Sequence, residues 1–433
     1  MNASFLYQAA YTDANTCTEG EALVCFDNTL KAYYIEENAK VSVQVETVEY
    51  GEALMDLWRS RHPKRSDVLT YTLASEAQPS DLLFLTQNQA GFQFDTLSAL
   101  DMSALHYDLP MISPELNLTD VRFMPLTGEG FAFITHLTQL EEMGVDISDV
   151  NQDNLVDAVD TFEKIQTLQK NWPTDQASFI FSLNEPYSFY PFLTASGWQL
   201  FETHDALDPR FEDERFLESL KFIQTLSKLD WNGTKENTAA AYDFAYSHAF
   251  QEDDFIFSIV STWMFVEDYQ ALTDSKWQVS LFPSMNQDTE PLTPFLREVK
   301  GYVLSSNARY PSASHEVLRL IQSTSGLQSL LDTTNLIPLG SKTQLNQLSF
   351  IQDIRKQFAL AFTSARSEPL IALEKNVGIP AFSLYFDIDF MPKIQALWNG
   401  EMTAEETRNQ IMMASDAWLY EHQQIESDVQ GNE

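Results

Sequence analysis

The sequence predicts an α/β protein of two lobes, each built on a doubly wound sheet. Apolar runs of strand length alternate with amphipathic helical stretches, and strands separated by helices imply parallel sheets covered on both faces. At 433 residues the chain exceeds one typical domain, so two lobes are favoured over one giant sheet. No Gly/Ser-rich linker separates two halves, and the chain is therefore expected to cross between the lobes several times.

The individual elements follow from the spacing of the apolar residues. Six runs of strand length are predicted as buried strands, at 22–26, 41–46, 81–86, 178–183, 255–261 and 301–306. Five stretches repeat apolar residues at helical spacing and are predicted as helices, at 50–62, 154–170, 213–229, 314–323 and 403–423.

The charge of the chain narrows the classes of partner. There are 26 basic and 63 acidic residues, and the formal net charge is −37. A nucleic-acid partner is therefore not expected, because binding phosphates requires a basic surface. Such self-repulsion suits a soluble monomer that does not bind acidic membranes. The one basic cluster, RSRHPKR at 59–65, is interpreted as a solvated helix end and the following turn.

Neither a membrane span nor a secretory signal is predicted from the sequence. The longest apolar run, 255–266, is far shorter than the roughly 20 residues that cross a bilayer. The first residues lack the basic flank and the long apolar region of a signal peptide. The two cysteines, Cys17 and Cys25, fit one local disulfide and two unpaired thiols equally well.

Polar and aromatic side chains follow the predicted strands, where ligands of open α/β sheets bind. No glycine-rich phosphate loop stands at these positions, which argues against a nucleotide site. Rings that give contact area and a few polar groups that fix orientation are typical of small-molecule sites. For a sugar, CH groups lie on ring faces while carboxylates and amides pair with hydroxyls. The residues are Asp27, Asn28, Gln87, Asn88, Gln89, Asn184, Glu185, Tyr187, Thr262 and Trp263.

The stretch LNEPYSFYP at 183–191 concentrates an acid and three rings between two prolines. Pro186 is expected to fix the exit from the strand, and Ser188 is expected to cap the helix that follows. In this interpretation Glu185 and Tyr187 face a ligand. The rings that are expected to pack inside instead are Phe189 and Tyr190.

Three segments resemble maltose- and maltodextrin-binding proteins, which belong to family 1 of the extracellular solute-binding proteins of ABC transporters. LNEPYSFYP resembles the family segment in which a Glu-Pro-Tyr triplet follows a strand and contacts the sugar. AFQEDDFIFSIVSTWMF at 249–265 reads without gaps onto the strand that leads to a sugar-stacking tryptophan, here Trp263. MPLTGEGFAFI at 124–134 resembles the first crossing between the lobes, where a glutamate contacts the ligand, here Glu129.

The resemblance also has departures, which limit what it implies about the ligand. The segment 81–93 aligns with one that supplies a stacking tryptophan and an Asp-Arg pair, and this chain has Leu85, Asn88 and Gln89 instead. Near 379–390 the counterpart of another stacking tryptophan is Phe386 or, with one gap, Tyr385. An oligosaccharide is therefore expected, without a commitment to maltose. The ligand-binding residues that the resemblance implies are Glu185, Tyr187, Trp263, Phe386, Glu129, Asn88 and Asn28.

The resemblance implies a two-lobed, type II periplasmic-binding-protein-like fold with the ligand cleft between discontinuous lobes. The N-terminal lobe would hold residues 20–128 and 293–345, the C-terminal lobe 132–289 and 350–425, and residues 1–19 an extension of unknown role. The implied function is capture of an oligosaccharide and its delivery to an ABC permease. The implied location is extracytoplasmic, as a cell-surface lipoprotein or in the periplasm. No catalysis and no cofactor are expected.

Other interpretations of the same residues stay open at this point. Tyr187, Trp263 and Phe386 also fit ordinary core packing. Glu129 and Glu185 could form the carboxylate pair of a glycan-cleaving enzyme. The same fold could bind a solute that is not a sugar or serve as a sensor.

A metal site is the weakest candidate. Residues 149–160 place oxygen ligands at several positions of an EF-hand calcium loop, but the glycine and the final glutamate are missing. The stretch also reads as an acidic helix start, which the helix dipole favours without a metal. The seven histidines show no spacing typical of zinc.

Overall fold

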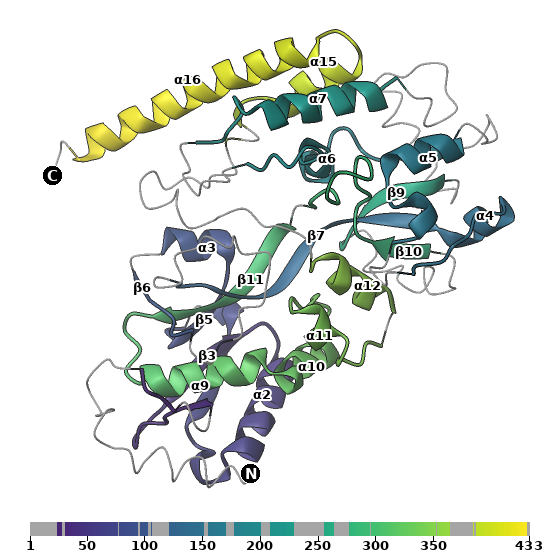
Figure 1. Ribbon diagram of the computed structural model, residues 1–433. Coiled ribbons are helices and arrows are strands. Elements are labelled where there is room, and N and C mark those ends of the chain that lie inside the picture. The colour runs from purple at the N-terminus through teal and green to yellow at the C-terminus, as the bar shows by residue number, and fades with distance from the viewer. Residues whose placement is uncertain are drawn as a thin grey trace. The chain divides into compact units, whose positions relative to one another are not determined.

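The structure is a computed structural model, shown in Figure 1. It describes residues 24–27, 31–76, 78–93, 96–102, 105, 121–150, 155–169, 177–200, 208–228, 255–263, 277–294, 296–351, 353–363, 384 and 387–430. The chain divides into two compact units. Unit 1 holds Met1–Leu109, Pro114–Gly128 and Glu298–Ile351, and unit 2 holds Pro110–Ser113, Glu129–Arg297 and Gln352–Glu433.

Unit 1 is built on a mixed sheet with helices packed against it. Its strands include β3 (Val41–Val45), β4 (Leu69–Leu73), β5 (Leu82–Thr86), β6 (Leu97–Ser98) and most of β11 (Leu296–Ser305). β3 runs parallel to β4 and to β5, whereas β11 runs antiparallel to β5 and to β6. The helices include α2 (Val48–Arg61), α3 (Gln87–Phe92), α9 (Pro311–Gln322), α10 (Thr324–Thr333) and α11 (Lys342–Leu345). A short hairpin joins β1 (Phe26–Asp27) to β2 (Ala32–Tyr33).

Local sequence explains why α2 begins and ends where it does. Thr47 caps its start, since the hydroxyl accepts a hydrogen bond from the amide of Tyr50. Its buried face includes Leu54 and Trp58, and the Trp58 indole donates to the Arg65 carbonyl at 2.8 Å. The basic cluster does end this helix, but its description as solvated is wrong for Arg65, which is buried and donates to the Glu36 carbonyl at 2.9 Å.

Unit 2 is built on four strands in the order β10-β7-β9-β8. They are β7 (Met124–His136), β8 (Ala177–Ile180), β9 (Phe255–Ser261) and β10 (Trp277–Ser280). β7 is antiparallel to both β9 and β10, and β8 is parallel to β9. All seven residues of β9 are buried, as expected for a central strand that is covered on both faces.

The helices of unit 2 enclose a core rich in phenylalanine. They include α4 (Leu137–Glu142), α5 (Phe162–Gln169), α6 (Pro186–Leu193), α7 (Glu214–Leu226), α12 (Asp353–Ala361), α15 (Phe390–Trp398) and α16 (Ala404–Gln430). α7, α15 and α16 pack on one another (Figure 1). Phe181 stacks on Phe192 of α6 at 4.7 Å between ring centroids and meets Trp398 of α15 edge-on at 5.9 Å. These contacts fix α6, and with it the segment that carries Glu185.

The α/β class predicted from the sequence is confirmed, but the prediction of parallel sheets is wrong because the sheet is mixed. A parallel neighbour needs a crossover connection of about a dozen residues or more, usually through a helix. β7 is instead antiparallel to β9 and β10, and β11 is antiparallel to β5 and β6. Both strands have residues in each of the two units. The type II two-lobed arrangement and the predicted lobe boundaries stay predictions.

Most predicted elements are present, with shifted ends. The strand predicted at 178–183 is Ala177–Ile180. Of the strand predicted at 22–26, residues 22 and 23 lie outside the described residues, and of the other three only Phe26 lies in a strand. The helix predicted at 154–170 begins later, at Phe162, and the one predicted at 403–423 extends to Gln430.

Two further observations bear on the sequence expectations. Within the described part of the chain, no helix is long and apolar enough to span a bilayer. Cys25 is disulfide-bonded, and the sequence holds one other cysteine, Cys17, which lies outside the described residues. The alternative of two unpaired thiols is therefore wrong.

Candidate functional site

Two aromatic rings and one cation come together in unit 2. The guanidinium carbon of Arg297 lies 4.9 Å from the ring centroid of Trp263 and 5.7 Å from that of Tyr187. Both rings are only partly buried, and Arg297 is exposed at the start of β11. We call Tyr187, Trp263, Arg297 and the neighbouring Glu185 the ring cluster. The structure thus brings two predicted rings together, and it adds a cation that the sequence did not indicate.

Glu185 is held at the start of α6. Its Oε1 accepts a hydrogen bond from the amide of Tyr187 at 3.3 Å, so Glu185 is the N-cap and Pro186 is the first helical residue. The prediction that Ser188 caps this helix is wrong, because the helix begins two residues earlier and the Ser188 hydroxyl donates to the Glu185 carbonyl at 2.9 Å. Phe189 and Tyr190 are buried, which confirms that these rings pack in the core.

The segment before α6 is fixed from another part of unit 2. The Gln395 side chain of α15 donates to the Asn184 Oδ1 at 2.7 Å and to the Leu183 carbonyl at 3.2 Å. This bridge holds the two residues that precede Glu185. Sequence patterns could not indicate Gln395, because it lies on a different helix far along the chain.

Trp263 is positioned by the end of β9 and by β7. The amide of Thr262 donates to the Gly130 carbonyl at 3.0 Å, which continues the β7 to β9 pairing by one residue. The indole then meets Phe131 of β7 edge-on, with 4.9 Å between centroids. Phe131 is itself buried. Trp263 therefore has one contact with the core and another with the exposed guanidinium of Arg297.

The carboxyl group of Glu185 has a perturbed pKa. Partial burial raises the pKa above the usual glutamate value, although the Tyr187 amide and the positive charge of Arg297 act to lower it. Burial prevails because the charged form loses more hydration than the Tyr187 amide and the charge of Arg297 replace. Removal of the Arg297 charge would shift the pKa of Glu185 further in the same direction.

We expect Glu185→Gln to make the ligand-free protein slightly more stable at pH 7. Because the folded-state pKa is raised, the contribution of Glu185 to stability is fully present below its unfolded pKa and is lost as the pH rises through the folded pKa. At pH 7 the ionised group is a net cost that glutamine removes while still capping α6. Solvent screens this half-exposed group, so the melting temperature should rise by only about 1 °C. Thermal unfolding at pH 7 and pH 4 tests this, since the difference should disappear at pH 4.

Three further predicted site residues have different outcomes. Glu129 is partly buried in β7 and shares a strand face with Phe131, two residues on, which contacts Trp263. Asn88 lies in α3 of unit 1, half-buried, next to Gln89, whose side chain and amide form a capping box with Thr86. Asn28 lies outside the described residues.

The remaining predictions concern an aromatic contact and a metal. Phe386 and its alternative Tyr385 lie outside the described residues. In the calcium-like stretch, Asp157 accepts the Val150 amide at 3.0 Å and Asp160 pairs with Lys164 at 2.8 Å. Among the described residues no group of three or more His, Cys, Asp or Glu could hold a metal ion.

The sequence matches no protein-family model and no curated protein. The resemblance to maltose- and maltodextrin-binding proteins therefore depends on the quoted segments alone and stays a prediction.

Proposed function

We propose that the protein is an extracytoplasmic solute-binding protein that captures an oligosaccharide at the ring cluster and delivers it to an ABC importer. The observation that carries the binding part is the convergence of Tyr187 and Trp263 on the exposed Arg297, beside Glu185. The type II arrangement of two lobes, the permease partner and the location belong to the same proposal. They come from the resemblance of the three quoted segments.

The chemistry of the ring cluster suits a sugar better than it suits a simple apolar ligand. Partly exposed rings offer faces for the CH groups of a pyranose. The guanidinium offers several N–H donors and the carboxylate offers acceptors, and both pair with hydroxyl groups by charge-assisted hydrogen bonds. An apolar ligand would leave both charged groups without such partners.

Trp263→Ala is expected to weaken maltodextrin binding by about 1 to 3 kcal/mol, or roughly 5- to 150-fold in Kd. Tyr187→Ala should lose a comparable or smaller amount, since its ring offers less area. Isothermal titration calorimetry with a series of maltodextrins measures both. Tyr420, an exposed tyrosine of α16, gives the matched control Tyr420→Ala, which should bind like the wild type. Affinities of the Trp263 and Tyr187 variants within twofold of the wild type would contradict this site.

One observation also favours a second candidate, a glycan-cleaving enzyme. A general acid needs a raised pKa, and the pKa of Glu185 is raised. In that case Glu129 would be the second carboxylate. Incubation with maltodextrins followed by chromatography decides between the two, because turnover that is abolished by Glu185→Gln would replace the transport proposal.

A further inference from the structure

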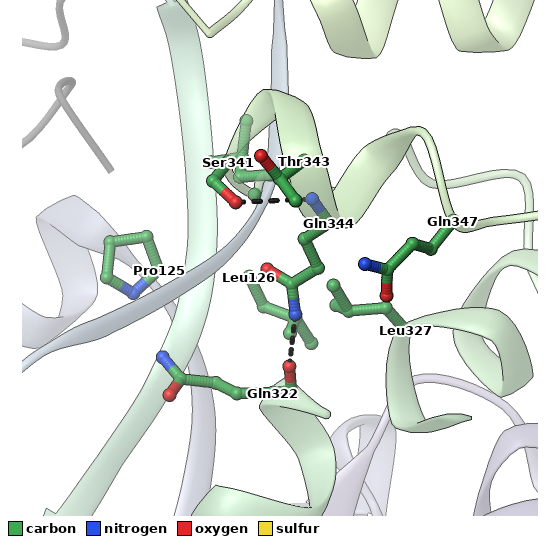
Figure 2. Close-up of a pocket in the computed structure, with 10 residues that line it drawn as sticks. Pro125, Leu126, Gln322, Leu327, Ser341, Thr343, Gln344 and Gln347 are labelled. Carbon is green, nitrogen blue, oxygen red and sulfur yellow. Dashed lines mark hydrogen bonds between the residues drawn. The ribbon is translucent and has the colours of Figure 1, made fainter. Parts of the chain in front are cut away.

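We propose that unit 1 carries a second small-molecule site, for a small neutral polyhydroxylated ligand such as a free monosaccharide or a polyol. The site is a pocket of about 340 Å³, formed by residues of β7, α9, α10 and α11 and by the segment that leads into α11 (Figure 2). None of its lining residues belongs to the ring cluster. The volume lies at the lower end of the range for ligand pockets, which limits the ligand to a small molecule.

The floor of the pocket is apolar and fixed. Leu126 of β7, Leu327 of α10 and Leu339 are all almost completely buried. The Leu339 amide donates to the Leu126 carbonyl at 2.8 Å, which ties the two walls together. The floor is therefore rigid, and little ordering of the protein opposes binding.

The upper part of the pocket consists of side-chain amides and hydroxyls. Gln344 is held in place, because its Nε2 donates to the Gln322 carbonyl at 2.6 Å and its amide donates to the Ser341 hydroxyl at 3.2 Å (Figure 2). Gln347 also contributes its amide, and its Oε1 accepts from the Thr324 hydroxyl at 3.3 Å. These groups are neutral donors and acceptors in defined positions.

The side-chain amides of Gln344 and Gln347 offer the hydrogen-bonding groups of this pocket. The Oε1 of Gln322 is buried away from solvent, so a ligand in the pocket does not reach it. A hydroxyl group both donates and accepts, so in the pocket it would donate to the Oε1 of Gln344 and accept from the NH2 group of Gln347. A ligand with several hydroxyls satisfies more than one amide at once.

The lining excludes most other ligand classes. No ionisable side chain is among the ten lining residues, although charged residues make up 21% of the chain. A phosphate, a carboxylate or a metal ion would lose its hydration there without a compensating charge. No aromatic ring lines the pocket either, so a nucleobase has nothing on which to stack. A small, uncharged molecule with hydroxyls and an apolar face remains.

The test is a titration of the full chain with D-glucose and with glycerol, followed by the leucine-methyl NMR signals. Binding should shift the methyl signals of Leu126, Leu327 and Leu339 in a saturable way, with a Kd on the order of millimolar. Gln344→Leu and Gln347→Leu should each weaken binding about fivefold or more. The same change at the exposed Gln410 of α16, Gln410→Leu, should leave the affinity unchanged.

Two readouts separate this proposal from its competitors. Gln347→Leu should weaken binding without a matching loss of melting temperature, because the Gln347 side chain contributes one long hydrogen bond, from the Thr324 hydroxyl at 3.3 Å, to the fold. A purely structural role predicts instead that affinity and melting temperature fall together. Trp263→Ala should leave the methyl shifts intact. The proposal is overturned if neither probe shifts these methyl signals up to about 100 mM, or if Gln344→Leu and Gln347→Leu both bind like the wild type. Shifts that disappear in Trp263→Ala would overturn it too, because the probe would then be bound at the ring cluster.

Discussion

Glu316→Ala is expected to lower the free energy of unfolding of unit 1 by about 3 to 5 kcal/mol. Glu316 of α9 is 1% exposed. Its carboxylate accepts hydrogen bonds from the Arg319 Nε at 2.7 Å and from the Tyr33 amide at 3.1 Å, and it lies 3.3 Å from the His62 Nε2. Alanine would leave these donors in the interior without their acceptor, which costs more than the intact arrangement contributes.

The pH dependence of this effect has a defined sign. Burial acts to raise the pKa of Glu316, but hydrogen bonds from Arg319 and His62 outweigh it, and the pKa lies below the usual glutamate value. A lowered pKa stabilises the fold above the unfolded pKa of about 4.3, and this stabilisation is lost as the pH falls through the folded pKa. The loss caused by Glu316→Ala should therefore be largest near pH 7 and shrink below pH 4.

Hydrogen exchange followed by mass spectrometry measures this loss separately in each unit. The peptides of α9 and of β2 should exchange faster in Glu316→Ala, while those of α7 and α15 in unit 2 should not. Glu37, an exposed glutamate of unit 1, gives the control Glu37→Ala, which should change stability by less than about 0.5 kcal/mol. Equal exchange rates for Glu316→Ala and Glu37→Ala would contradict the prediction.

A second buried carboxylate at the same helix behaves in the opposite way. Glu36 accepts hydrogen bonds from the amides of Ser312 and Ala313 at the start of α9, at 3.0 and 2.9 Å. Its pKa is raised by burial, because these amides and the charge of Arg65 compensate only in part. The contrast with Glu316 shows that a hydrogen bond from a guanidinium to the carboxylate itself lowers the pKa where backbone amides and a charge farther away do not outweigh burial.

Strands that consist of one continuous apolar run were predictable from the sequence, whereas their direction in the sheet was not. The run at 255–261 is β9 with the predicted ends, since a fully buried strand has an unmistakable composition. Apolar content carries no information on whether a strand runs parallel or antiparallel to its neighbours. The antiparallel direction of β7 and β11 depends on how the chain passes between the two units, which no local pattern shows. β11 was also predicted too short, because three of its first five residues, from Leu296 to Lys300, are charged and interrupt the apolar run.

The candidate site was predictable in part. Tyr187 and Trp263 follow strands, and the resemblance identified them as a pair. Arg297 was missed because it lies in the charged start of β11, which was not assigned to a strand. No strand signal could have placed it there, because Arg297 and Glu298 are consecutive charged residues and break the alternation of a half-buried strand. The pocket of unit 1 had no sequence signal, since Gln322 ends α9, Gln344 lies in α11 and Gln347 lies in the turn after α11.

Gly301→Ala is expected to destabilise unit 1 by about 3 kcal/mol, at the upper end of the cost of overpacking. A Cβ at this position of β11 would lie 2.2 Å from the Met124 carbonyl oxygen and 2.8 Å from the Pro125 Cα. Both atoms belong to the backbone of β7, so no side-chain rotation relieves the clash. β11 has no room to retreat, because the following residues Tyr302 and Val303 are buried and pair with β5.

Gly400→Ala separates this steric cost from the general cost of losing a glycine. Gly400 has φ +75° and nothing within 4 Å of an added Cβ, so only its backbone conformation opposes alanine. That should cost about 1 kcal/mol. Chemical denaturation with hydrogen exchange as the local readout compares the two variants. Since the added Cβ of Gly301→Ala clashes with β7, the largest increase in hydrogen-exchange rate should appear in the unit 1 residues of β7 and β11. If Gly301→Ala were as stable as Gly400→Ala, the prediction would be contradicted, because β7 and β11 could then move apart without a loss in the free energy of unfolding.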